Sequence, residues 1–315
     1  MITSLVITAI SASHSVSAGI VTFGSGGNAF NMDFTTIGSP GNAADTTGDP
    51  NPAGAVSYAY QLGTYEVSEN MITKFNASQS LQITKNTRGV DKPATSVSWN
   101  EAARFVNWLN TSKGYQAAYN FTSTGVNDNI ALWTSGAAWQ QDGQNLFRHK
   151  DANFWLPSMD EWYKAAYFDP NSGNYFDFPN GSDTAPMAVA SGTAANTEVY
   201  GGQSGPADVN QAGGLSPFGI MGLGGNVWEW EETASSLNNS LGSSFRGIRG
   251  GRWNGDSSSL SSSIRISVIP ASEDSGIGFR VASLSSSAVA VPEPSSWVLS
   301  LMGLAGWWYR GRRRK

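Results

Sequence analysis

Helical patterning is confined to two short segments of this 315-residue chain, and this limits the folds that it can adopt. In residues 98–110 (SWNEAARFVNWLN), Ser98 and Glu101 form a capping box ahead of apolar side chains at helical spacing. Residues 158–168 (SMDEWYKAAYF) repeat this device. Elsewhere, short alternating stretches such as residues 55–67 (AVSYAYQLGTYEV) are joined by Gly-rich connections. The sequence therefore predicts an α+β fold with much coil.

The chain contains no cysteine and only two histidines, His14 and His149. This composition excludes disulfides, thiolate metal sites and a cysteine nucleophile, and with only two histidines a catalytic triad or a multi-histidine metal site is hard to build. His149 lies in a polar, loop-like stretch, where we expect a solvated side chain rather than a ligand or a base. We therefore assign no catalytic residue.

Basic residues are concentrated at the carboxyl end, where five of the nineteen Lys and Arg occupy the last six positions. Residues 1–290 carry 14 basic and 23 acidic side chains. Because nucleic acid is itself strongly negative, this acidic body argues against nucleic acid as a partner.

The amino-terminal segment has the pattern of an export signal. Residues 1–18 contain no charge, include a short apolar stretch, and end in Val-Ser-Ala, a small-residue pattern that a signal peptidase accepts. The alternative is an N-terminal strand of the folded body. The body is predicted to span residues 19–283, with residues 38–54 as a surface loop before the first core strand.

The carboxyl end has three parts in fixed order. After a Ser/Ala linker at residues 284–290, residues 291–315 consist of VPEP, an uncharged run of 15 residues, and RGRRRK. Such a run spans about 22 Å as a helix, short of the roughly 30 Å hydrocarbon core, and flanking aromatic and basic residues can make up the difference. The basic end stays cytoplasmic, which places the body outside the membrane.

This tail resembles the PEP-CTERM sorting signal of Gram-negative bacteria. The resemblance implies recognition and cleavage by an exosortase. The protein is then exported, anchored transiently in the inner membrane through a short transmembrane segment, and sorted to the cell surface or extracellular polymer. A plain tail anchor is the alternative.

Five groups of motifs in the body resemble the formylglycine-generating enzyme (sulfatase-modifying factor) family. In chain order they are YQLGTYEVSENMITKF at 60–75, PATSVSWNEAARFVNWLN at 93–110, FWLPSMDEWYKAAYF at 154–168, GNVWEW at 225–230, and RGIRGGRW at 246–253 with GFRVA at 278–282. The resemblance implies a coil-rich, C-type-lectin-like fold with few helices and a small antiparallel sheet.

Most of the distinctive residues in these motifs are predicted to be scaffold. Tryptophans can bury large areas where regular sheet is scarce, and carboxylates paired with arginines can hold loops in place. The residues concerned are Trp99, Trp108, Trp155, Trp162, Trp228, Trp230 and Trp253, with Glu66, Glu101, Glu161, Glu229, Arg249, Arg265 and Arg280.

The chemistry implied by the resemblance is only partly available to this chain. Formylglycine-generating enzymes use two cysteines after the RGG motif to bind copper, and here Gly255 stands where the first would fall. Family members also hold calcium near GNVWEW, which implies Gly225, Val227 and Glu229 as calcium-binding residues. However, Gly222 replaces an acidic or amide ligand that usually precedes that motif. The alternative role for Glu229 is to cap nearby backbone amides.

The sequence therefore favours a non-catalytic, exported domain that acts in ligand binding or matrix structure, with a carbohydrate or a peptide as its ligand. The alternative is a metal-dependent oxidoreductase of the nonheme iron enzyme grouping that shares this domain. A matrix component that self-associates without a ligand is a third interpretation.

Overall fold

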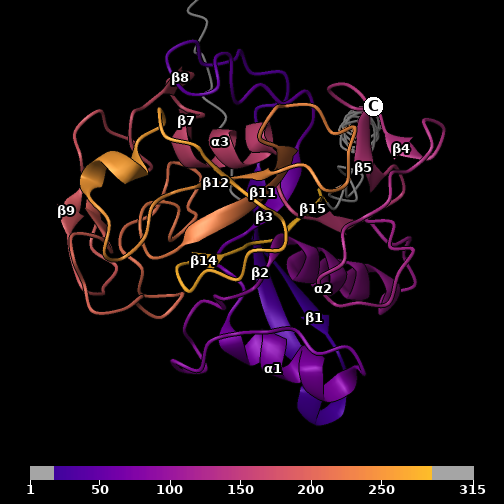
Figure 1. Cartoon of the computed structure of the whole chain (residues 1–315). Coiled ribbons are helices and arrows are strands. Elements are labelled where there is room, and N and C mark those ends of the chain that lie inside the picture. The colour runs from indigo at the N-terminus through magenta and orange to yellow at the C-terminus, as the bar shows by residue number, and fades with distance from the viewer. Residues whose placement is uncertain (1–17, 286–315) are drawn as a thin grey trace, which may run out of the picture. The chain divides into compact units, whose positions relative to one another are not determined.

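The computed structural model describes residues 18–285, which contain three α-helices (Figure 1). They are α1 (Glu69–Ser78), α2 (Trp99–Thr111) and α3 (Met159–Tyr167), with two short 3-10 helices, η1 (Gly26–Asn28) and η2 (Ser257–Leu260). The two helices predicted from capping boxes are confirmed, with Ser98 and Ser158 as N-caps and both boxes closed. The structure adds α1, which begins after the N-cap Ser68.

The larger sheet has five antiparallel strands in the order β1-β2-β3-β15-β6. Its strands are β1 (Ala18–Phe23), β2 (Phe30–Ile37), β3 (Tyr60–Gly63), β15 (Ala282–Leu284) and β6 (Phe154–Trp155). The β1–β2 hairpin precedes residues 38–54, so the prediction that this segment comes before the first core strand is wrong. The segment instead connects β2 to β3, and the Gly-rich sequence before it concealed the hairpin.

The second sheet has four strands in the order β13-β12-β11-β14, of which only β11 and β14 run parallel. Its strands are β11 (Trp228–Ala234), β12 (Arg246–Arg249), β13 (Ile266–Val268) and β14 (Ile277–Gly278). The GNVWEW and RGG motifs thus lie on neighbouring strands. Three two-stranded ribbons complete the structure: β4 (Ala138–Trp139) with β5 (Asn145–His149), β7 (Phe168–Asp169) with β8 (Asn174–Tyr175), and β9 (Met187–Ala188) with β10 (Thr197–Glu198).

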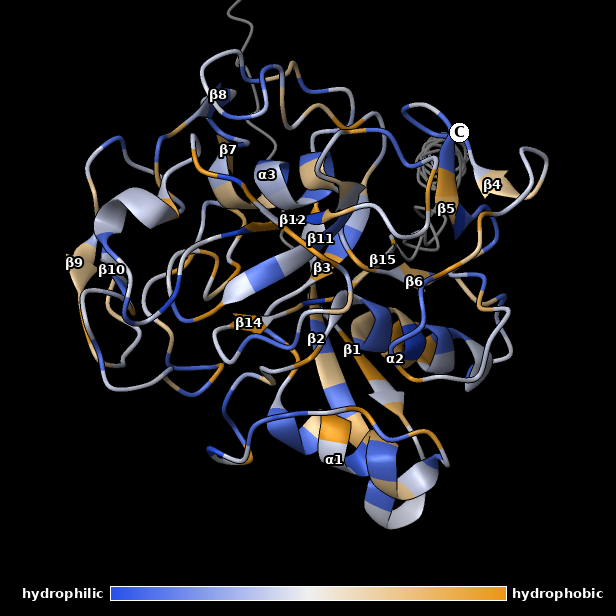
Figure 2. Ribbon diagram, viewed as in Figure 1, coloured by the Kyte–Doolittle hydropathy of each residue, from blue (hydrophilic) through white to orange (hydrophobic). Residues whose placement is uncertain are grey.

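The hydrophobic core depends on large aromatic side chains, because most strands are very short. The predicted scaffold tryptophans are buried, apart from the partly buried Trp108. Helix α2 packs against β6 and α3 against β11, and α2 carries hydrophobic and hydrophilic residues side by side (Figure 2). A C-type-lectin-like α+β fold is therefore confirmed, in which long coil segments are held by aromatic packing.

The sorting features predicted for the two ends lie outside the described residues. Of the signal peptide predicted for residues 1–18, only Ala18 is described, as the first residue of β1, and of the linker and tail predicted from residue 284, only residues 284 and 285 are described, with Leu284 as the last residue of β15. Within residues 18–285, no helix has the length and apolar character needed to cross a bilayer.

Candidate ligand-binding pocket

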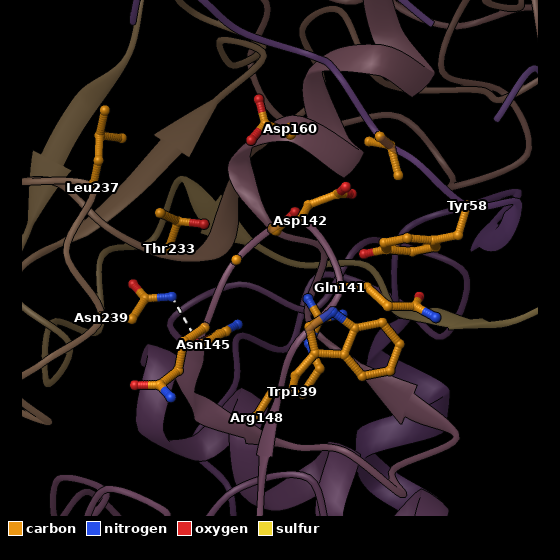
Figure 3. Close-up of a pocket in the computed structure, with 14 residues that line it drawn as sticks. Tyr58, Trp139, Gln141, Asp142, Asn145, Arg148, Asp160, Thr233, Leu237 and Asn239 are labelled. Carbon is orange, nitrogen blue, oxygen red and sulfur yellow. Dashed lines mark hydrogen bonds between the residues drawn. The ribbon is translucent and has the colours of Figure 1, made fainter. Parts of the chain in front are cut away.

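A cavity of about 160 Å³ opens between the β4–β5 ribbon, the start of α3 and the segment after β11 (Figure 3). We call it the Arg148 pocket. It is lined by Val56, Tyr58, Trp139, Gln141, Asp142, Gly143, Gln144, Asn145, Arg148, Ser158, Asp160, Thr233, Leu237 and Asn239. Since one water occupies roughly 30 Å³ of liquid, the cavity has the volume of about five waters. It can take one polar ring or side chain, but not a whole drug-sized ligand.

Arg148 is a fixed, fully compensated charge at the base of this pocket. Its guanidinium forms paired hydrogen bonds to Glu161, both at 3.1 Å, and to Glu232 at 2.7 and 3.0 Å. It also lies against the rings of Trp139 and Trp155, 5.0 and 4.5 Å from their centroids. The planar fork of Arg suits such bidentate pairing and ring stacking. The base of the pocket is therefore rigid.

The charges in this network shift the pKa of each member. Burial lowers the pKa of Arg148, but Glu161 and Glu232 outweigh burial and hold that pKa above its ordinary value. Burial raises the pKa of Glu161, yet Arg148 and several hydrogen bonds prevail and lower it. For Glu232 burial prevails over Arg148, and its pKa is raised. Arg148 and Glu161 thus form the firmly ionised pair.

Two aspartates form one side of the rim. Asp160, in the first turn of α3, accepts a hydrogen bond from the Gly54 amide at 2.6 Å, and Asp142 accepts one from the Ser57 amide at 3.0 Å. Burial raises the pKa of Asp160 to about 6, against the opposing effect of the Gly54 amide. Each carboxylate thus holds residues 54–57 through one of its oxygens.

Amide side chains and two aromatic rings form the remaining walls. Asn239 donates to Asn145 at 2.8 Å across the mouth, and Trp139 and Tyr58 lie opposite (Figure 3). Aromatic faces with amide and carboxylate groups around them supply both apolar contact and directional hydrogen bonds. None of the lining residues is a histidine or a cysteine. This arrangement suits binding of a polar, ring-shaped ligand.

The structure gives the predicted calcium residue Glu229 a different partner. Glu229 lies on β11, where its carboxylate binds Arg280 through both oxygens and accepts from the Trp162 indole at 2.8 Å. Its hydrogen-bond partners are thus side chains and not the backbone amides of the alternative prediction. Gly225 and Val227 lie just before it, and the Gly225 amide donates to the Gly250 carbonyl. Among residues 18–285, no three His, Asp or Glu side chains gather as a metal site.

In the region where the resemblance would place copper, backbone hydrogen bonds and a cation–ring contact hold the chain. Gly255 is held by backbone hydrogen bonds to Gly201 and Arg252, and Trp253 lies beneath the guanidinium of Arg88 at 4.8 Å. Because the chain has no thiol to bind copper, the residues present do not fit that metal.

His149 is less solvated than predicted. It ends β5, is 13% exposed, and packs edge-on against Trp133 at 4.7 Å. Its Nδ1 accepts from the Asp151 amide, and burial lowers its pKa, with Asp151 opposing. It is a packed, neutral residue.

The pocket residues Trp139, Asp142 and Asp160 were missed from the sequence, since no local pattern brings their segments together.

The fold defines a C-type-lectin-like α+β domain. The profile of the sulfatase-modifying factor enzyme 1-like domain matches residues 21–284, and the chain belongs to that family. A search of curated proteins finds no significant match.

Several solved structures share the fold. Treponema denticola variable protein 1 superposes with a TM-score of 0.56 at 20% identity, covering 85% of this chain and 99% of its own. CarF gives 0.57 at 19% identity, covering 81% and 98%, and PvdO from Pseudomonas aeruginosa gives 0.53 at 16%, covering 84% and 98%. At these identities the likeness extends to the fold alone.

Proposed function

We propose that this protein is an exported, non-catalytic member of its family whose Arg148 pocket binds one sugar unit of a carbohydrate. The observation that carries this proposal is the lining of the pocket, which combines an aromatic wall, amides and two carboxylates with no cysteine or histidine. Hydroxyl groups of a sugar can donate to Asp142 and Asp160, while its apolar face packs on Trp139.

The cavity volume favours a carbohydrate over a folded partner. A space of about 160 Å³ accepts a terminal unit, while the rest of a chain lies along the exposed turn of residues 140–144. A peptide would have to place one polar side chain in the same space. That ligand is a separate outcome of the test below.

Asp142 is the best position for a variant that keeps the fold. It is exposed and has a positive φ of 57°, which asparagine tolerates well. In Asp142→Asn, the amide oxygen can still accept from the Ser57 amide. The matched control is Asp151→Asn, an exposed carboxylate in the turn after β5 and outside the pocket.

The experiment is a glycan array with residues 19–285, followed by calorimetry on the glycans that bind. We expect Asp142→Asn to weaken binding about tenfold, as for loss of one charge-assisted hydrogen bond, and Asp151→Asn to bind like the wild type. Binding to peptides alone would contradict the carbohydrate ligand. Stoichiometric iron or copper in the purified protein would favour the oxidoreductase instead.

We further propose that a signal peptidase processes the amino terminus and that an exosortase processes residues 291–315. The order of breaker, apolar run and basic cluster supports this route. Deleting residues 291–315 should release the protein from the inner-membrane fraction, as measured by fractionation and immunoblotting. A truncated protein that fractionates like the intact one would contradict the tail assignment.

A further inference from the structure

The hydrogen-bond donors that line the Arg148 pocket are largely directed at the protein itself. Arg148 donates to Glu161 at 3.1 Å, and the Tyr58 hydroxyl donates to the same carboxylate at 2.6 Å. Asn239 donates to Asn145 at 2.8 Å, and Asn145 donates to the second carboxylate that holds the guanidinium. These side chains hold the walls together, so a ligand gains few donors from them.

The acceptors in the same lining belong mainly to two carboxylates, which form one side of the rim (Figure 3). Asp142 and Asp160 each accept one hydrogen bond, from a backbone amide of residues 54–57. An ionised carboxylate offers about four acceptor positions, so one hydrogen bond leaves each of them with acceptor capacity. Gln141 and Gln144 also line the pocket, but an amide donates and accepts equally well. The lining is therefore richer in acceptors than in available donors.

The lining also carries more negative than positive charge. Its two anions are Asp142 and Asp160, and its one cation is Arg148. The positive charge of Arg148 is already offset by Glu161 and Glu232, with which it forms ion pairs at 3.1 and 2.7 Å. A ligand in this cavity therefore meets two carboxylates whose charge no lining residue neutralises, and a positive charge on the ligand is favoured.

The charged groups behind the walls leave this balance negative. Lys164 interacts with Asp142, but it is buried, donates to a backbone carbonyl at 2.8 Å and does not line the pocket. Glu161 and Glu231 interact with Asp160 and, together with burial, raise its pKa to about 6. Two further carboxylates thus oppose the ionisation of Asp160, and a cation in the cavity would relieve that opposition.

We propose that the Arg148 pocket selects a sugar unit that bears a primary ammonium group, as in glucosamine, over its neutral counterparts. This inference rests on the proposed carbohydrate-binding function and names the class of sugar. An ammonium group has three donors and no acceptor, so it matches a lining rich in carboxylate acceptors. Its hydrogen bonds to Asp142 and Asp160 also join opposite charges, which those of a hydroxyl do not.

The test compares three trisaccharides on the full chain purified in detergent. They are the trimer of glucosamine, cellotriose as its neutral counterpart of matched size, and the trimer of N-acetylglucosamine. Calorimetry at pH 7 measures each affinity. We expect the glucosamine trimer to bind at least about tenfold more tightly than cellotriose, as for one charge-assisted hydrogen bond. The N-acetylated trimer, which has no ammonium group, should bind no more tightly than cellotriose.

Variants separate charge from shape. In the double variant Asp142→Asn/Asp160→Asn, which keeps the shape of both side chains, the preference should fall below about threefold. Asp151→Asn removes an exposed carboxylate outside the pocket and should keep the full preference. Lowering the pH to 5 should reduce the preference of the wild type, because Asp160 then takes up a proton. The same change should have less effect on Asp160→Asn.

The outcomes distinguish this inference from the function on which it rests. Equal affinity of the wild type for the glucosamine trimer and for cellotriose, with Asp142→Asn weakening both, would overturn the charge preference and keep the carbohydrate site. A preference that persists in the double variant would also overturn the inference, by placing the ammonium group elsewhere. No binding of any glycan, among the three trimers or on the array, would overturn the proposed function itself.

Discussion

The two buried arginine clusters use the same residue types but differ in how completely their groups are paired. Around Arg148, the carboxylates of Glu161 and Glu232 also accept from tyrosine, tryptophan and asparagine side chains, and no carboxylate oxygen is left over. Around Arg280, Glu66 and Glu198 each keep an unpaired oxygen. A closed network can serve as a rigid pocket base, whereas in the open one burial raises the pKa of Glu66 to about 8 and the pKa of Glu198 above its ordinary range, so that protons can neutralise both groups.

The largest effect should come from removing the central cation of the closed cluster. Arg148→Met leaves two carboxylates buried and uncompensated, so the free energy of unfolding should fall by about 3–5 kcal/mol in urea titrations. The control is Arg252→Met, since Arg252 forms an exposed pair with Asp274 and should change stability by less than about 1 kcal/mol. Equal losses in the two variants would show that the Arg148 network does not stabilise the fold.

Neutralising one carboxylate in each cluster should change the free energy of unfolding by different amounts in the two clusters. Glu232→Gln should lower the free energy of unfolding by about 1.5–3 kcal/mol, because it removes charge-assisted hydrogen bonds to Arg148. Glu198→Gln should cost nothing under the same conditions, because it removes an uncompensated buried charge. Urea midpoints provide the measurement. A large loss in the free energy of unfolding of Glu198→Gln would mean that the Glu198 carboxylate has a stabilising partner.

A smaller effect on stability should come from Asp160 at the pocket rim, and it should depend on pH. Burial raises the pKa of Asp160 from 3.8 to about 6. The stability that this proton contributes is complete below pH 3.8 and is lost as the pH rises through 6. Relative to Asp160→Asn, wild type should therefore gain up to about 2 kcal/mol between pH 8 and pH 4. Denaturant unfolding across this range measures it. A difference independent of pH would contradict the raised pKa.

The smallest effect should come from the helix caps. Ser158→Ala and Ser98→Ala each remove a hydroxyl that accepts from the backbone amide of the capping-box glutamate, at a cost of about 1 kcal/mol. Ser158→Ala should cost more of the two, because Glu161 in its capping box is also the partner of Arg148. Chemical unfolding of both variants decides this. The opposite order would show that the α3 cap does not orient the network.

Local signals in the sequence predicted local structure well. The capping boxes of α2 and α3 each lie within four residues, and both are present in the structure. The N-cap Ser68 of α1 was missed because it follows directly on a stretch with strand-like alternation. Short strands such as β15 were also missed, since they exist only through pairing with β3 and β6.

The residues of the buried clusters and of the pocket were likewise predictable only where the signal in the sequence is local. The predicted scaffold tryptophans are buried, apart from the partly buried Trp108, and Glu161 and Glu229 pair with arginines as predicted. The resemblance at GNVWEW implied calcium at Glu229, and its pairing with Arg280 was not predicted because Arg280 is 51 residues away along the chain. Nothing near Asp142 or Trp139 in sequence indicates that they would share a cavity with Asp160. That arrangement depends on tertiary packing.

The Arg148 pocket is assembled from stretches that lie as far apart as Tyr58 and Asn239. Contacts between such distant segments form late in folding, because long loops must close first. A partly folded chain would therefore have the motif tryptophans but no working pocket. Binding at this pocket would select completed molecules and, by favouring the folded state, would slow their digestion by proteases.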